Sequence, residues 1–303
     1  MKILLASPRG FCAGVNRAIS LLRSALEKFG APIYVYHEIV HNTWVVKEFR
    51  DLGVVFVDSF DEVPDGSCVM YSAHGVAPVV REIAVEKRFR VVDATCPLVA
   101  KIHRQARLLA EKGAQILLIG HAGHDEIVGV VGEAPDAIQV IDSTQDARSV
   151  CVRPDAPVAY LTQTTLSVEE TARIIDVLEE RFPQIIHPTA SCICFATQNR
   201  QRAVRELAER ANLVLIVGSP NSSNSRRLRE LAAAENRPAF LIDGADELDF
   251  EWFRPSDIVL ISAGASAPES VVQSVVERIA QRFPTEIETV EVCCETFLFS
   301  LEH

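Results

Sequence analysis

The 303-residue sequence has no apolar run that approaches the ~18 residues of a membrane-spanning helix. The apolar segment Ile3–Ala6 is shorter than the hydrophobic region of a signal peptide, and Pro8 interrupts it. Positive charge is also scarce, because 41 Asp and Glu outnumber 30 Lys and Arg and give a formal net charge of −11. We therefore expect a cytoplasmic protein that spans no membrane and does not take nucleic acid as its main partner.

Two nucleotide-binding motifs are missing as well. Neither G-x-G-x-x-G nor G-x-x-x-x-G-K-[ST] occurs, which argues against a dinucleotide-binding or P-loop enzyme. With 48% hydrophobic and 23% charged residues, the composition is that of a folded globular protein long enough for two or three domains. In a reducing compartment, the eight cysteines indicate metal or catalytic use of some thiols and not four disulfides.

Short strand and helix patterns alternate along the whole chain. The first few are a strand at 3–6, a helix at 15–28, a strand at 33–36 and a helix at 43–52. Such alternation is typical of an α/β protein with parallel sheets. The same order returns in the remainder, which favours a repeated unit over one long sheet.

Three cysteines occupy equivalent places in this pattern. Cys12, Cys96 and Cys194 each follow a strand and precede a predicted helix, at residues 15–28, 97–112 and 198–211. The positive end of a helix dipole stabilises a thiolate, which favours a metal ligand or a nucleophile. Their spacing matches neither paired zinc cysteines nor a local ferredoxin run, so by spacing alone three buried or capping cysteines are an equal alternative.

Polar loops recur at similar distances after each cysteine. A first loop carries His41, His124 or Ser222, and a second carries His74, Thr164 with Thr165, or Ser266. Ligand sites of open parallel sheets lie beyond the carboxyl ends of the strands. The repeat therefore predicts three similar α/β units placed around an axis, with their loops facing one central pocket.

The repeat also sets the expected boundaries. The first unit covers residues 14–96, the second 97–193, and the third 194–282, completed by an N-terminal strand within 1–13. By the same logic a strand at 184–187 completes the second unit, and residues 283–303 form a C-terminal extension. Its last three residues, Leu301–His303, are set apart because they read like the start of an expression tag.

The chemistry follows from these loops. Three thiolates around an axis can hold three corners of a cubane iron–sulfur cluster and leave the fourth iron open to a substrate. A histidine taken singly is more often structural, but the recurring set forms mostly neutral donors at helix N-termini, which suits a diphosphate. This set comprises His41, His74, His124, Ser222, Ser223, Asn224 and Ser266.

Three side chains of these loops have competing interpretations. Ser266 also reads as the start of a capping box with Glu269. Glu126 is either an exposed loop acid or, inside a pocket, the proton donor that lets a hydroxyl leave as water. Thr164 or Thr165 is a candidate relay for that proton.

The other five cysteines receive a simpler interpretation. Cys68 and Cys151 are expected in the core or in loops, and Cys293 with Cys294 as thiols of the tail. Cys192 is different, because an extended backbone over residues 192–194 would place its side chain on the face of Cys194. It would then compete for iron.

Taken together, the motifs resemble those of the 4-hydroxy-3-methylbut-2-enyl diphosphate reductases from Met1 to about Phe283. They are RGFCAGV, VHN, SAHG, DATCPLV, GHAGHDE, TQTTLS, CFATQNRQ, GSPNSSNS and SAGASAP. The resemblance implies three α/β domains with pseudo-threefold symmetry around one central four-iron four-sulfur cluster. It also implies reductive dehydroxylation of the allylic diphosphate to isopentenyl and dimethylallyl diphosphate, with electrons from ferredoxin or flavodoxin.

The resemblance further assigns roles by motif. It implies that Cys12, Cys96 and Cys194 ligate the cluster, and that Glu126 and Thr164 handle the proton and the substrate hydroxyl. It implies diphosphate binding by His41, His74, His124, Ser222, Ser223, Asn224 and Ser266. Two alternatives remain open: a zinc phosphohydrolase that uses HxxHxE and HxxxH, and a non-catalytic diphosphate-binding module with structural cysteines.

Overall fold

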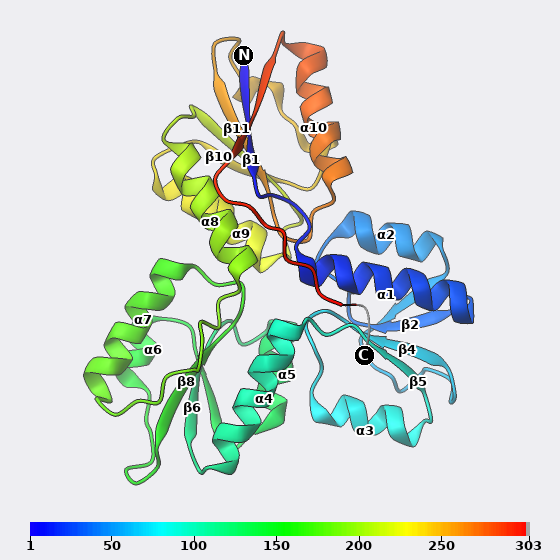
Figure 1. Cartoon of the computed structure of the whole chain (residues 1–303), viewed down its shortest axis with the longest axis vertical. Coiled ribbons are helices and arrows are strands. Elements are labelled where there is room, and N and C mark those ends of the chain that lie inside the picture. The colour runs from blue at the N-terminus through cyan, green and yellow to red at the C-terminus, as the bar shows by residue number, and fades with distance from the viewer. Residues whose placement is uncertain (301–303) are drawn as a thin grey trace. The chain divides into compact units, whose positions relative to one another are not determined.

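The computed structural model describes residues 1–300 and contains three parallel β-sheets, each flanked by helices (Figure 1). All pairings between its named strands are parallel. The predicted class, an α/β protein with three parallel-sheet units, is therefore confirmed. The residues Leu301–His303 that were set apart from the fold lie outside the described part of the chain. No helix within residues 1–300 is long and apolar enough to cross a membrane.

Sheet B has four strands in the order β3-β2-β4-β5. Its strands are β2 (Ile33–Tyr36), β3 (Val54–Val57), β4 (Cys68–Tyr71) and β5 (Arg90–Asp93). The helices of this stretch of chain are α1 (Ala13–Phe29), α2 (Thr43–Asp51) and α3 (Pro78–Glu86). Strand β4 is buried at all four positions, as expected for a central strand with helices on both faces.

Sheet C has three strands in the order β7-β6-β8. They are β6 (Gln115–Ile119), β7 (Ile138–Ile141) and β8 (Val158–Thr162), and their helices are α4 (Pro97–Glu111), α5 (Asp125–Glu133), α6 (Thr144–Ser149) and α7 (Val168–Arg181). Adjacent residues Leu117 and Leu118 belong to different hydrophobic clusters, so both faces of the sheet are buried. The prediction of a strand at 184–187 is wrong, because this segment forms only a single isolated bridge, between Ala159 and Ile186, in the described part of the chain. A proline on each side of the segment lacks the N–H that a longer ladder of hydrogen bonds would need.

Sheet A has five strands in the order β10-β9-β11-β1-β12. They are β1 (Lys2–Ser7), β9 (Leu213–Val217), β10 (Ala239–Ile242), β11 (Ile258–Ala263) and β12 (Glu286–Glu291). The helices are α8 (Phe195–Ala208), α9 (Ser223–Ala234) and α10 (Glu269–Arg282), with the short 3-10 helices η1 (Ala245–Glu247) and η2 (Phe250–Trp252). The N-terminal strand thus lies in the sheet of the third repeat, where the repeat logic had placed it.

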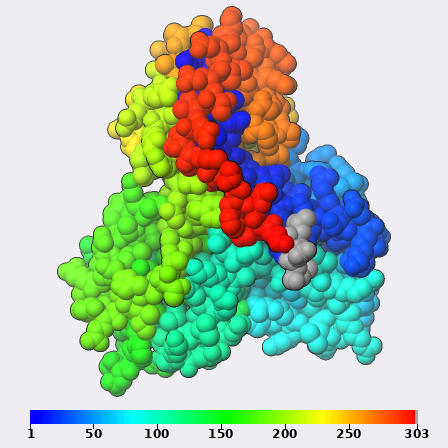
Figure 2. Space-filling model, in the orientation of Figure 1, coloured from blue at the N-terminus to red at the C-terminus, as the bar shows by residue number. Residues whose placement is uncertain are grey.

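Part of the C-terminal extension also belongs to this sheet. Strand β12 pairs with β1 in register from Lys2↔Glu286 to Ser7↔Glu291 and forms one edge. The C-terminal segment, in red, lies on the surface beside the N-terminal segment, in blue (Figure 2). Three of the six residues in its sequence EIETVE are glutamates, and charged side chains on an edge strand discourage further pairing.

The chain divides into two compact units. The sheet A unit contains Met1–Asn16, Val40–Glu48 and Phe195–Leu298, and the sheet B–C unit contains Arg17–Ile39, Phe49–Cys194 and the chain from Phe299. The segment that carries His41 therefore belongs with sheet A, although the flanking strands belong to sheet B. The predicted site residues fall into two sets, one in each unit.

Candidate functional site

Each of the three repeated cysteines directly precedes a helix. Helix α1 begins one residue after Cys12, α4 has Cys96 as its N-cap, and α8 begins one residue after Cys194. None of these three cysteines forms a disulfide, and all three are partly exposed. Two of the helices begin two or three residues earlier than the sequence predicted. The cysteines consequently lie directly at the helix N-termini, where the helix dipole acts most strongly on a thiolate.

The repeat extends to one hydrogen bond of each cysteine. The backbone N–H of Cys12 donates to Ala265 O at 3.1 Å, that of Cys96 to Ala73 O at 3.0 Å, and that of Cys194 to Thr164 O at 3.1 Å. Two of these acceptors, Ala265 and Ala73, directly precede Ser266 and His74 in the sequence. The third acceptor is the candidate residue Thr164 itself. Each cysteine is therefore held against the second polar loop of a repeat, and the equivalence deduced from spacing is a structural one.

In the sheet A unit, the segment that bears His41 is fixed at both of its ends. The hydroxyl of Ser266 donates to His41 O at 2.8 Å, and Thr43 N–H donates to Ser219 Oγ at 3.0 Å. The predicted capping box at Ser266 is wrong. Helix α10 has Pro268 as its cap residue without a side-chain bond, because the Ser266 hydroxyl is engaged with His41 instead.

The N-terminus of α9 is a buried polar part of this unit. Ser222, Ser223 and Asn224 are 4%, 3% and 3% exposed, and Ser222 Oγ accepts from Ser225 N–H at 3.3 Å. Neither the nitrogen nor the oxygen of the Asn224 amide has a partner among the described residues. An unsatisfied buried polar group costs about 1–3 kcal/mol. A ligand that bonds to this amide at the helix N-terminus recovers that cost.

Two glycines make room for this helix terminus. A Cβ added to Gly264 would lie 2.0 Å from Ser225 Oγ, and one added to Gly218 would lie 2.2 Å from the same atom. The two residues immediately follow β11 and β9, so the strand ends approach the first turn of α9 more closely than any side chain permits. Packing thus fixes the height of the Ser222–Asn224 turn above the sheet.

In the sheet B–C unit, Glu126 and Thr164 are joined by two hydrogen bonds. Thr164 donates its N–H to Glu126 Oε1 and its hydroxyl to Oε2, each at 2.7 Å. The two residues are 2% and 5% exposed. Because Thr164 O also accepts from Cys194 N–H, a continuous path runs from the cysteine to the carboxylate. The carboxyl group can hold a proton with a hydroxyl as its neighbour, and of the two candidate threonines only Thr164 is observed to bond to it.

Sequence reasoning missed Gln163, which supports this arrangement. Its side chain is fully buried, accepts from His121 N–H at 3.1 Å and donates to Thr165 Oγ1 at 2.9 Å. It therefore joins the loop after β6 to the loop after β8, and Thr165 is engaged here instead of with Glu126. A polar side chain at the end of an entirely buried strand was the signal for it.

The first turn of α5 collects several titratable side chains. His124 is the N-cap, and its Nδ1 accepts from Glu126 N–H at 3.1 Å, so Nε2 carries the proton and can donate. The His74 and His124 rings meet edge to face with centroids 5.7 Å apart. His74 Nδ1 also lies 3.4 Å from Ser72 Oγ. Two of the candidate diphosphate-binding histidines are thus neighbours within this unit.

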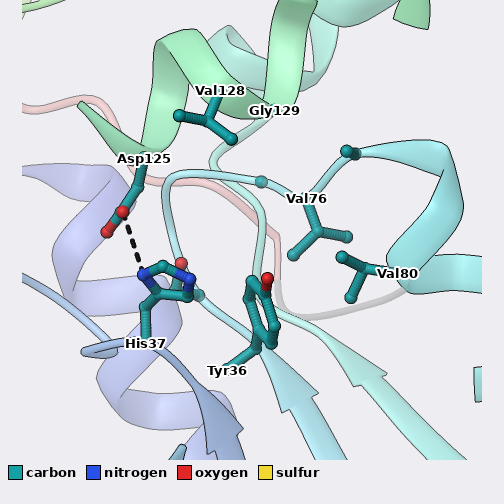
Figure 3. Close-up of a pocket in the computed structure, with 10 residues that line it drawn as sticks. Tyr36, His37, Val76, Val80, Asp125, Val128 and Gly129 are labelled. Atoms are coloured by element: carbon teal, nitrogen blue, oxygen red, sulfur yellow. Dashed lines mark ion pairs between the residues drawn. The ribbon is translucent and has the colours of Figure 1, made fainter. Parts of the chain in front are cut away.

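Sequence reasoning also missed His37 and Asp125. His37 Nδ1 lies 2.9 Å from Asp125 Oδ1, and both side chains line a small cavity (Figure 3). The hydrogen bond with Asp125 raises the pKa of His37 against the opposing effect of partial burial. Both residues lie in motifs already singled out, HxxxH and HxxHxE, but spacing alone did not show that they pair.

Cys192 takes no part in this site. It is 8% exposed and packs in a hydrophobic cluster with Ile102 and Leu161. The backbone bends at residues 192 and 193, so the extended conformation that would align it with Cys194 does not occur. Burial raises the pKa of its thiol, which disfavours the thiolate needed for metal binding. Cys68 is likewise buried in β4, whereas Cys151 and Cys294 are exposed.

Comparisons with known proteins agree over nearly the whole chain. The family model of the LytB protein matches residues 3–280. The chain is 52% identical over 301 residues to the 4-hydroxy-3-methylbut-2-enyl diphosphate reductase of Rhodopirellula baltica, with 99% of this chain and 94% of that protein covered. It is 49% identical to the reductase of the same name from Streptomyces coelicolor, with 99% and 89% covered.

A solved structure is similar as well. The E-1-hydroxy-2-methyl-but-2-enyl-4-diphosphate reductase of Plasmodium falciparum superposes with a TM-score of 0.94 at 35% identity, with 98% of this chain and 93% of that chain covered.

Proposed function

Because the chain belongs to the LytB protein family, we propose that it reduces 4-hydroxy-3-methylbut-2-enyl diphosphate to isopentenyl and dimethylallyl diphosphate. Full-length relatives that share about half of its residues carry the name of this reductase. The observation that carries the proposal is the hydrogen bond repeated at Cys12, Cys96 and Cys194. It supports one common task for three cysteines that lie far apart in the sequence.

That task is to ligate one four-iron four-sulfur cluster. The three residues fit it as partly exposed cysteines without disulfides at helix N-termini, and three protein ligands leave one iron for the substrate. When bound, the cluster supplies two electrons, one at a time, and a Lewis-acidic iron for the substrate alcohol. We propose ferredoxin or flavodoxin as the source of these electrons.

The polar loops serve the diphosphate. We propose that the sheet A unit contributes His41, Ser222, Ser223, Asn224 and Ser266, and that the sheet B–C unit contributes His74 and His124. The unsatisfied amide of Asn224 and the N-terminus of α9 support this role in the first set. In the second, the capping bond to His124 Nδ1 places the ring proton on Nε2, which makes this nitrogen a donor, and the His74 ring lies beside it.

Glu126 and Thr164 move the proton. The overall change adds two electrons and two protons, breaks the carbon–oxygen bond and releases water. The hydroxyl leaves as water only if it receives one of these protons. We propose that Glu126 holds this proton and that Thr164, bonded to both carboxylate oxygens, orients the acid and contacts the substrate hydroxyl.

Anaerobic purification tests the proposal. The protein should be brown, with near-stoichiometric iron and sulfide, and should reduce the substrate with a chemical or protein electron donor. Cys96→Ser should lose most of the iron and all useful turnover, whereas the matched controls Cys68→Ser and Cys151→Ser should keep both. Retained iron and turnover in Cys96→Ser would overturn the ligand assignment. Colourless protein that contains zinc and hydrolyses phosphate esters would support the hydrolase alternative instead.

A further inference from the structure

Asp125 is an unexpected neighbour for the diphosphate-binding residues. It is the first residue of α5, between the capping His124 and the acid Glu126. Its Oδ2 lies 3.9 Å from His74 Nδ1, and its side chain is 20% exposed. A carboxylate beside donors for a diphosphate opposes the anion by like-charge repulsion, and the chain as a whole carries a net charge of −11. The carboxylate therefore requires a nearby cation.

His37 provides this cation from another element. It directly follows β2, and its Nδ1 meets the other carboxylate oxygen, Asp125 Oδ1, at 2.9 Å (Figure 3). The backbone of His37 is left-handed, with φ of 57°, and its N–H donates to Val57 O at 2.8 Å. A non-glycine residue in this region points to a constraint from its surroundings. The turn directs the imidazole toward α5.

The surroundings of His37 favour its protonated form. Besides Asp125, the acids Asp58 after β3 and Glu38 in the same turn raise its pKa, and partial burial lowers it less than Asp125 raises it. The Tyr36 ring packs against it with centroids 4.3 Å apart, and His74 is a further titratable group at Asp125. One oxygen of the carboxylate is thus neutralised by His37 while the other faces His74.

We propose that His37 is a positioning residue for diphosphate binding: it neutralises Asp125 and holds this carboxylate so that it orients His74. The inference rests on the proposed function, because it takes the diphosphate as the ligand of His74. His37 itself does not touch the ligand. Its removal takes away the positive charge that meets Asp125 Oδ1 within the diphosphate-binding set.

A double-mutant cycle on the anaerobic holoenzyme separates this role from a merely structural one. His37→Asn removes the cation while Asn tolerates the left-handed backbone, and Asp125→Asn removes the negative charge. For His37→Asn we expect the Kd for inorganic diphosphate and the KM for substrate to rise about tenfold, with little change in kcat. In the Asp125→Asn background the same change should alter Kd by less than about twofold. His187→Asn, which removes an exposed histidine near Glu179, is the matched control and should change neither constant.

The pH dependence supplies a second readout. As pH rises through the raised pKa of His37, the wild type loses the same charge that His37→Asn lacks. The ratio of the Kd of His37→Asn for diphosphate to that of the wild type should therefore fall toward one as pH rises. Three results would each overturn the inference while leaving the proposed function intact. The first is an unchanged Kd for diphosphate in His37→Asn, and the second is an equal loss of affinity when the same change is made in the Asp125→Asn background. The third is a ratio of variant to wild-type Kd that does not depend on pH. A wild type that does not bind diphosphate would overturn both.

Discussion

The N-termini of α9 and α5 are built on opposite principles. The α9 terminus holds Ser222, Ser223 and Asn224, has no ionisable side chain among these three, and is fixed by close packing against glycines. The α5 terminus holds His124, Asp125 and Glu126, and is fixed by polar bonds to neighbouring loops. One helix terminus thus depends on shape and the other on charge. We therefore expect only the second to respond to pH.

The largest expected effect is on the charged terminus. Glu126→Gln keeps the size of the side chain but removes the acid, so kcat should fall by ~10² to 10⁴ while substrate binding changes little. Steady-state rates and diphosphate affinity measure the two quantities. Glu170→Gln in the first turn of α7 is the matched control, an exposed glutamate at another helix N-terminus. If Glu126→Gln kept more than roughly a tenth of kcat, the proton-donor role would be rejected.

The next effect tests the neutral terminus. Asn224→Ala removes an amide without other partners in residues 1–300, so a lost ligand bond should weaken diphosphate binding by about 1.5–3 kcal/mol, or roughly 10- to 150-fold. Iron content should stay the same. The ratio of variant to wild-type Kd should not vary between pH 6 and pH 8, since an amide does not titrate there. His124→Ala, measured in parallel, should also weaken diphosphate binding, because it removes the imidazole that caps α5.

Packing at the neutral terminus can be tested directly. Gly264→Ala places a methyl group 2.0 Å from Ser225 Oγ and 3.1 Å from its Cβ, so the first turn of α9 must shift. We expect a several-fold weaker affinity for diphosphate and a lower Tm. The double variant Gly264→Ala with Ser225→Ala removes the nearest atom and should recover most of both losses. Equal defects in the single and double variants would show that the glycine is required for another reason.

The smallest expected effect concerns stability at the charged terminus. The pKa of His37 is raised above its usual value of 6.5 in the folded protein. Its pair with Asp125 therefore stabilises the fold fully below pH 6.5 and loses this contribution as pH rises through the raised pKa. The Tm difference between wild type and His37→Asn should be largest near pH 6 and should vanish in alkaline buffer. Calorimetry at several pH values measures it, and a constant difference would contradict the charge interpretation.

The sequence predicted the parts of the molecule that depend on local pattern. Cys12, Cys96 and Cys194 stand out because a strand ending and a helix beginning leave a periodic signature on both sides. The polar loops followed from the same signature. This was enough for the three-sheet α/β class, because each repeat contains its own strands and helices in order.

The remainder depends on tertiary contacts that leave no periodic trace. The His37–Asp125 pair and the bond from His121 to Gln163 each join loops that follow different strands, so neither can be read from one stretch of sequence. Ser266 had the correct spacing for a capping box, yet its hydroxyl reaches the carbonyl of His41 across the fold. Strand β12 was missed because half of its six residues are glutamates and because, within residues 1–300, it pairs with β1 at the edge of the sheet.

The place of β1 in sheet A bears on how the protein is made. This strand is synthesised first, yet its two neighbours, β11 and β12, are synthesised last. At ~5–20 residues per second, translation needs on the order of tens of seconds to supply them. Cys12 follows β1 and is held by Ala265, so the cysteine that leaves the ribosome first is positioned last. Assembly of the proposed cluster on all three cysteines would therefore follow the completion of the chain through β11 and the Ala265 loop.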